Sequence, residues 1–114
     1  IAKLYNMLPA DELSDNNRTA VNNATVRSIF LIDPQKKIKM MLTYPMTTGR
    51  NFDEILRVLD SIQLSSNHKV ATPANWKNGE DVIIIPAVSD DEANTLFPNG
   101  FKKIKPYLRT TEQP

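Results

Sequence analysis

Arg50 lies in the segment of the chain whose residue types are best suited to chemistry. It stands between Gly49 and Asn51, and the pattern that follows predicts a helix, so backbone amides and a guanidinium would meet at a helix N-terminus. Such a group can bind an anion or a polarised oxygen. The residues leave a second interpretation open, in which Gly49 serves a turn and Arg50 is an ordinary surface charge.

Arg27 is the second candidate because it opens an apolar stretch, residues 28–32, that is typical of a β-strand. A charge in that place must lie at a sheet edge, find a partner or serve a function. A hairpin would bring Arg27 beside Tyr44, and a short loop would return Arg50 to the same place. We therefore expect the two guanidiniums to converge on one pocket, although an edge position would also explain Arg27.

Few other residues can do chemistry. The chain has 114 residues and no cysteine, which excludes disulfides, thiolate metal sites and a cysteine nucleophile within it. Its single histidine, His68, follows a polar stretch and is expected to be solvated. The sequence has no Ser–His–Asp set, no carboxylate pair of recognisable spacing and no phosphate loop. We predict neither a metal nor a cofactor.

The composition narrows the class of protein. The formal net charge is +1, which argues against a nucleic-acid partner because such proteins usually carry a concentrated basic excess. The 40% hydrophobic content argues against a disordered chain. No apolar run approaches the roughly 20 residues of a membrane-spanning helix, so we expect no membrane partner.

Local patterns predict an α/β arrangement that positions the two arginines. The elements expected in the first part are a helix over residues 1–8 closed by Pro9, a polar loop over 10–24, a strand over 26–32, a turn over 33–37 and a second strand over 38–44. Asn51 can cap a helix, and Glu54 three residues later makes the pattern similar to a capping box. An apolar stripe follows these residues. A helix of about four turns is therefore predicted, ending at residues 65–67.

Residues 70–114 change in character. Prolines divide this part into short segments, which indicates an extended arm rather than a second core, and we expect the arm to pack against a second chain. Trp76 is its expected packing anchor. The predicted segments are a strand over 82–85, a helix capped by residues 89–92 and stopped by Pro98, and a final strand over 107–109.

Taken together, these segments resemble the one-cysteine peroxiredoxins over nearly the whole chain. The residues that carry the resemblance are 25–34, 36–39, 44–57, 70–77, 107–109 and 113–114. The most specific part is the Tyr-Pro…Thr-Gly-Arg-Asn segment of residues 44–51, followed by the Ala-Thr-Pro…Trp-Lys segment of residues 71–77. The chain resembles the C-terminal half of such a protein, because the family's Pro-x-x-x-Thr-x-x-Cys segment is absent.

The resemblance implies a fold and an activity. The fold would be part of a thioredoxin-like fold, a β-hairpin plus a helix, with a C-terminal extension that helps to build a homodimer. The activity would be thiol-dependent reduction of a peroxide, with Arg27 and Arg50 in the active site and the cysteine supplied by an N-terminal half. A guanidinium near a thiolate favours the ionised nucleophile, and its N–H groups can hold the peroxide oxygens.

The same resemblance implies a division of the chain and a location. Residues 1–66 would belong to the thioredoxin-like domain and residues 67–114 to the extension, in a cytoplasmic protein. The alternative function is a non-catalytic interaction fragment that keeps only the dimer-forming extension. In either case the chain alone is expected to be inactive as a peroxidase, because it has no thiol.

Overall fold

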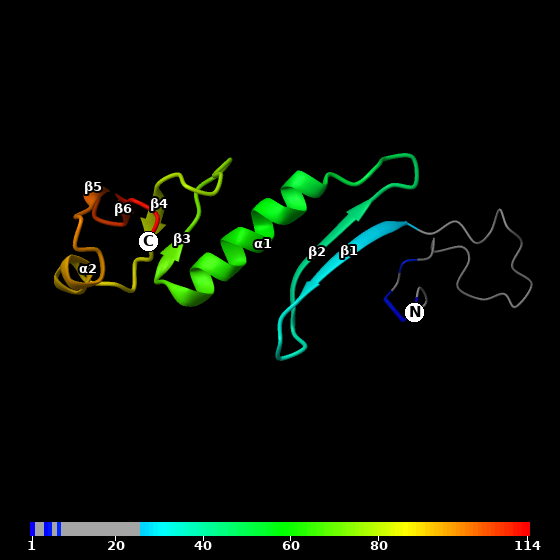
Figure 1. The fold of residues 1–114 in the computed structure, drawn as a ribbon, viewed down its shortest axis with the longest axis horizontal. Coiled ribbons are helices and arrows are strands. Elements are labelled where there is room, and N and C mark those ends of the chain that lie inside the picture. Colours follow the sequence, from blue (N-terminus) through cyan, green and yellow to red (C-terminus); the bar gives the residue numbers. More distant parts are fainter. Residues whose placement is uncertain (2–3, 6, 8–25) are drawn as a thin grey trace, which may run out of the picture. The chain divides into compact units, whose positions relative to one another are not determined.

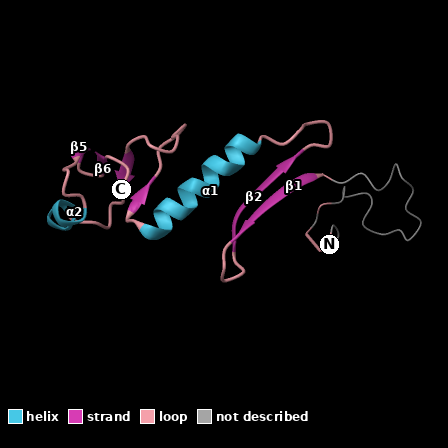
Figure 2. Ribbon diagram, in the orientation of Figure 1, coloured by secondary structure: helices cyan, strands magenta, loops and turns pink. Residues whose placement is uncertain are grey.

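The computed structural model describes residues 1, 4–5, 7 and 26–114, and the predicted loop over 10–24 and half of the predicted helix over 1–8 lie outside them. The described chain contains two helices and two sheets, which confirms the predicted α/β class (Figure 1, Figure 2). It divides into two compact units, Ile1–Asn51 and Phe52–Pro114, which are described separately below. No described helix is long and apolar enough to cross a membrane.

The first unit is built on the predicted hairpin. Strands β1 (Arg27–Ile32) and β2 (Ile38–Tyr44) pair antiparallel, with Arg27 opposite Tyr44 and a register shift at Leu31/Ile32. The connecting turn closes because the Lys36 amide donates to the Asp33 carbonyl at 2.9 Å. Pro34 presets the turn, and Lys36 takes a left-handed φ of 64°, as the residue after a type I turn in a hairpin commonly does.

One face of the hairpin carries both a polar and an aromatic contact. There the Ser28 and Thr43 hydroxyls share a hydrogen bond of 3.0 Å, and the rings of Phe30 and Tyr5 lie 4.9 Å apart between centroids. Met41, on this face, is 65% exposed. The sheet has two strands only in the described part of the chain, so both of its outer edges lack a paired strand there.

The second unit begins with helix α1 (Phe52–Asn67), which has the predicted start, length and end. Asp53 and Glu54 lie in its first turn, where the helix dipole favours negative charge. Its apolar stripe is only partly covered, since Phe52 is 67% exposed and Leu56 is 57% exposed. Leu64, near the other end, packs against the core of the unit.

A four-stranded antiparallel sheet and a short helix complete this unit. Its elements are β3 (Val70–Ala71), β4 (Val82–Ile84), α2 (Asp90–Leu96), β5 (Lys102–Lys105) and β6 (Leu108–Thr111), and the strand order is β3-β4-β6-β5. Helix α2 starts at the predicted cap, where the Ser89 hydroxyl accepts from the Glu92 amide at 3.1 Å. The helix ends at Leu96, just before Pro98.

The prediction of an extended arm without its own core is wrong. The buried apolar residues of the described chain all lie in this unit: Val70, Trp76, Val82, Ile84, Val88, Ala93 and Phe97. The prolines that suggested an arm lie in the connections between elements, where they do not interrupt the sheet. Large residues of this segment are therefore buried within one chain, among them Trp76, Val82, Ile84 and Phe97, whereas Leu96, Ile104 and Tyr107 are 43%, 49% and 68% exposed.

The packing units and the predicted domain division are different descriptions. By packing, α1 belongs with the C-terminal sheet, because its residue Leu64 packs against the core there. The boundary between the two compact units in the sequence falls between Asn51 and Phe52. The family-based division after residue 66 stays a prediction.

Trp76 is the centre of the C-terminal core. It is 1% exposed, and its indole N–H donates to the Glu80 carbonyl at 3.0 Å, so its one polar atom is satisfied. A turn delivers it, because the Trp76 amide donates to the Pro73 carbonyl at 3.2 Å and Asn75 takes a φ of 60°. Asparagine tolerates that left-handed conformation better than most residues. The predicted anchor role is confirmed.

Replacing Trp76 should therefore unfold the C-terminal unit far more readily than replacing an exposed aromatic residue. Trp76→Ala is expected to lower the free energy of unfolding by roughly 3–5 kcal/mol, through lost burial and an unfilled cavity. Tyr107→Ala is the matched control, because its ring is mostly solvated. Urea unfolding followed by far-ultraviolet circular dichroism measures both, and equal losses would contradict the assignment of the core.

Candidate functional site

The site predicted from the two arginines begins with a cross-strand pair in the first unit. Arg27 opens β1 and lies directly opposite Tyr44, the last residue of β2. Directly opposed residues of an antiparallel pair project from the same face of the sheet, so the two side chains are neighbours. Arg27 is half-buried, whereas the loop that follows Tyr44 is exposed.

The loop after β2 folds back on the same tyrosine. It turns at residues 45–48, where the Thr48 amide donates to the Pro45 carbonyl at 3.0 Å. The Asn51 amide then donates to the Tyr44 hydroxyl at 3.3 Å. Tyr44 thus borders Arg27 through its backbone register and lies beside Arg50 through the adjacent Asn51.

Arg27 and Arg50 have no acidic partner in the part of the chain that the structure describes, since no carboxylate there forms an ion pair with either. A guanidinium without a carboxylate partner can hold a negatively charged or strongly polarised oxygen or sulfur. The direction and separation of the two guanidiniums stay a prediction.

Arg57 is an arginine that the sequence reasoning did not single out. It binds Glu54 through two hydrogen bonds, of 2.6 Å from Nε and 2.9 Å from Nη2, and it also donates to the Trp76 carbonyl at 3.3 Å. This hydrogen-bonded arginine holds the pKa of Glu54 below its usual range. The three-residue spacing of Glu54 and Arg57 on a predicted helix was the available signal.

Arg109 is the second arginine that was missed, and it is the most deeply buried charge of the described chain at 3% exposure. Its guanidinium pairs with Asp90 at 2.8 Å and donates to the carbonyls of Ile85 and Val88. It also lies over the ring of Phe101, 5.9 Å from the centroid. The alternation of β6, with Arg109 and Thr111 on one face, was the signal that could have placed it inside.

Asp90 carries two positive partners. Its pKa is lowered, first by the hydrogen bond from Lys103 and second by the hydrogen bond from Arg109. The Lys103 ammonium lies 2.7 Å from its carboxylate. Asp90 thus ties the first turn of α2 to both β5 and β6.

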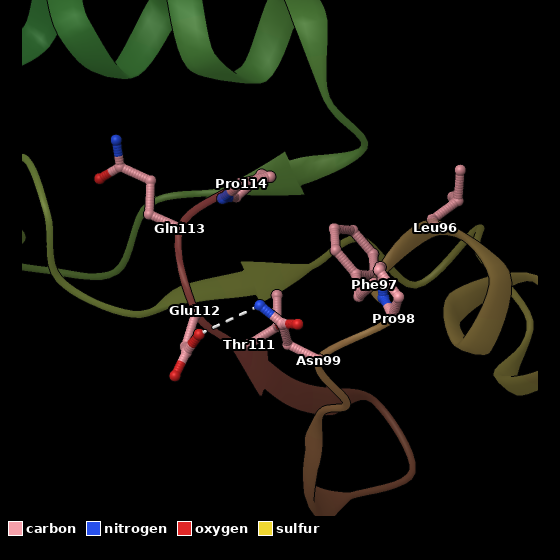
Figure 3. A pocket seen from close by; sticks show the side chains of 8 residues that line it. All are labelled: Leu96, Phe97, Pro98, Asn99, Thr111, Glu112, Gln113 and Pro114. Atoms are coloured by element: carbon pink, nitrogen blue, oxygen red, sulfur yellow. Dashed lines mark hydrogen bonds between the residues drawn. The ribbon is translucent and has the colours of Figure 1, made fainter.

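The remaining surface offers little chemistry. His68 is exposed, as predicted, and the described residues contain no group of three metal-ligating side chains. The pocket of Figure 3, about 70 Å³ in volume, lies between the end of α2 and the C-terminal residues. Glu112 is its one charged side chain, so the pocket has no catalytic set.

Comparison with known proteins gives one consistent result. Residues 61–100 match the family model described as the C-terminal domain of 1-Cys peroxiredoxin. The whole chain is 51% identical to a 1-Cys peroxiredoxin of Dictyostelium discoideum, of which it covers 44%. It is 49% identical, again over its full length, to peroxiredoxin-6 of Mus musculus, of which it covers 51%. The chain therefore spans about half the length of the curated relatives that it matches.

A solved structure agrees. A yeast mitochondrial 1-Cys peroxiredoxin, studied for thiol resolution by the glutathione and thioredoxin systems, superposes with a TM-score of 0.82. It is 50% identical, and the match covers 97% of this chain and 51% of that one. Such proteins have a thioredoxin-like fold, so the predicted partial thioredoxin-like class is confirmed.

The ion pairs of Asp90 with Lys103 and with Arg109 make the stability of the C-terminal unit depend on pH. Because the folded pKa of Asp90 is lowered, its stabilising effect is complete above the unfolded pKa of about 3.9 and is lost as pH falls through the folded pKa. Asp90→Asn should lower the melting temperature at neutral pH, and the difference from the unchanged protein should shrink in acid. The fluorescence of Trp76, the only tryptophan, follows unfolding.

The neighbouring Asp91→Asn is the control, since Asp91 forms no ion pair with any described residue. A difference between Asp90→Asn and the unchanged protein that persists at acidic pH would contradict the ion-pair explanation.

Proposed function

The chain belongs to the 1-Cys peroxiredoxins, and from that premise we propose that it forms the C-terminal half of a thiol peroxidase. The whole protein would reduce hydrogen peroxide and organic hydroperoxides, in antioxidant defence and redox homeostasis. The observation that carries this proposal is an identity of about half over the full chain to proteins named as peroxiredoxins.

The reaction divides between two halves of the protein. A cysteine thiolate from the N-terminal half attacks one peroxide oxygen, the O–O bond breaks, and the other oxygen leaves as water or an alcohol after taking up a proton. The cysteine becomes a sulfenic acid, and a thiol reductant later returns it to the thiol. This chain has no cysteine, so its contribution lies in binding and electrostatics.

Arg27 and Arg50 are the proposed catalytic residues. Their positive charge favours the thiolate over the thiol, which makes the nucleophile available at neutral pH. Their N–H groups also hold the peroxide and stabilise the charge that develops on the leaving oxygen. Their lack of carboxylate partners in the described chain supports this role, because a guanidinium paired with a carboxylate would offer less to an anion.

The open hairpin supports an N-terminal half as partner. A two-stranded sheet is marginally stable alone, and β1 and β2 have no further strand in the described chain. Strands from the N-terminal half would pair with this hairpin, cover its apolar residues and bring the cysteine to the arginines.

We also propose a homodimer formed with the help of the C-terminal unit. The residues available for it are the exposed apolar ones, such as Leu96, Ile104 and Tyr107, since the others already fill the unit's own core.

A cytoplasmic location remains part of the proposal, although one relative from Saccharomyces cerevisiae is named as mitochondrial.

The arginine roles can be tested in the whole parent protein. Arg27→Ala and Arg50→Ala should each lower the second-order rate of peroxide reduction by roughly 100-fold or more, as loss of a transition-state donor does. They should also raise the pKa of the cysteine, which thiolate absorbance measures separately from turnover. Lys37→Ala, on the exposed hairpin turn, is the matched control and should leave both quantities unchanged.

The 114-residue chain alone should consume no peroxide in the presence of a dithiol. Restoration of activity by adding the cysteine-bearing half would support the peroxidase. An arginine variant with the full rate and an unchanged cysteine pKa would instead favour the alternative of a non-catalytic interaction fragment.

A further inference from the structure

The chain contains an exposed Asn–Gly pair at the tip of a tight turn. Residues 77–80 form a β-turn, in which the Glu80 amide donates to the Lys77 carbonyl at 3.0 Å. Gly79 takes a φ of 102°, which suits the third position of a type II turn and is strained for any residue with a Cβ. Asn78 and Gly79 are both exposed.

The side chain of Gln113 holds this pair from the C-terminal end of the chain. Its Oε1 accepts from the Gly79 amide at 2.6 Å, and its Nε2 donates to Asn78 Oδ1 at 2.7 Å. A single planar amide thus binds the main-chain nitrogen of Gly79 and the side-chain carbonyl of Asn78 together. Gln113 lies 34 positions after Gly79 and 35 after Asn78 in the sequence, so only the fold brings it into contact with them.

These two groups are the reacting pair of asparagine deamidation. The Gly79 nitrogen loses its proton to hydroxide and bonds to Asn78 Cγ, and the side-chain nitrogen leaves as ammonia, which forms a succinimide. Water then opens the succinimide at either carbonyl and yields aspartate or isoaspartate. Glycine favours this reaction because it has no side chain to block the ring closure.

The Gln113 amide opposes the reaction in two ways. An amide oxygen is too weak a base to take the Gly79 proton, and its hydrogen bond keeps that proton in place. Ring closure also requires the nitrogen to approach the face of the Asn78 carbonyl. The bound geometry instead turns the edges of both groups toward Gln113.

We propose that Asn78 is a deamidation site that Gln113 protects, so that the site reacts when the C-terminal residues detach. Detachment exposes both groups to water at once, since one side chain holds both. The isoaspartate product then adds a methylene to the main chain at residue 78, which moves the Gly79 nitrogen away from its binding position. Gln113 can no longer bind both groups, so the modification makes detachment permanent.

The chain provides its own reference site at Asn99–Gly100. The Gly100 amide donates to the Phe97 carbonyl at 2.9 Å. The Asn99 side-chain nitrogen donates a long hydrogen bond of 3.5 Å to the Glu112 carboxylate (Figure 3). Figure 3 also shows the Gln113 side chain pointing away from Asn99. Removing the Gln113 amide should therefore leave the reaction at Asn99 unchanged.

The experiment compares the full chain with its Gln113→Ala variant, incubated at mildly alkaline pH and mapped by peptide mass spectrometry. The mass gain from replacement of NH₂ by OH is followed at Asn78 and Asn99 in the same samples. Gln113→Ala should deamidate at Asn78 about five- to tenfold faster, because two hydrogen bonds are lost. Gln63→Ala is the matched control, since Gln63 lines the same polar groove as Gln113 and should not alter the rate.

Each outcome decides the proposal. Selective acceleration at Asn78, with unchanged fluorescence from the buried Trp76, supports it. Equal rates at Asn78 in the two proteins overturn it, as does a parallel acceleration at Asn78 and Asn99, which would trace the effect to loss of folding.

Discussion

The buried guanidinium of Arg109 is the constraint around which the C-terminal unit is organised. A charge at 3% exposure is costly unless it is paired and hydrogen-bonded, so the elements near it must present oxygen atoms inward. Asp90 does so from the first turn of α2, and the carbonyls of Ile85 and Val88 do so from the connection after β4. The Arg109 side chain therefore fixes the positions of α2 and of the loop between β4 and α2 relative to its own strand, β6.

The local parts of this fold could be predicted from the sequence, and the core could not. The hairpin and its turn follow from two apolar stretches joined by a turn sequence with Pro34, and the start of α2 follows from Ser89, because each depends on residues close together in the chain. The core of the C-terminal unit joins very short strands, two residues long in β3 and three in β4, which leave no periodic pattern. Its burial arises from contacts distant in sequence, and prolines in the connections disguised it.

In the candidate site, too, local sequence predicted some features, whereas others depend on residues far apart in the chain. Residue types marked Arg27 and Arg50 as possible sites but left a surface role open for both, and only the resemblance to a family favoured an active-site role. The roles of Arg57 and Arg109 could not be predicted in this way, because they depend on partners such as the Trp76 carbonyl and Asp90, many positions away. The two units also differ in completeness. The second has a closed core with Trp76 at its centre, whereas the first leaves Met41 mostly exposed beside an open sheet.

The outer strand of the C-terminal sheet has a consequence for how the protein behaves at high concentration. Strand β5 carries Lys102, Lys103 and Lys105 in four consecutive exposed residues, and the opposite edge, β3, is only two residues long. A second sheet that joined β5 would bring like charges together and strip them of water, while β3 offers too few hydrogen bonds to template growth. The C-terminal sheet is therefore resistant to fibril-like stacking, whereas the longer, less charged strands of the hairpin have no such protection in the described chain.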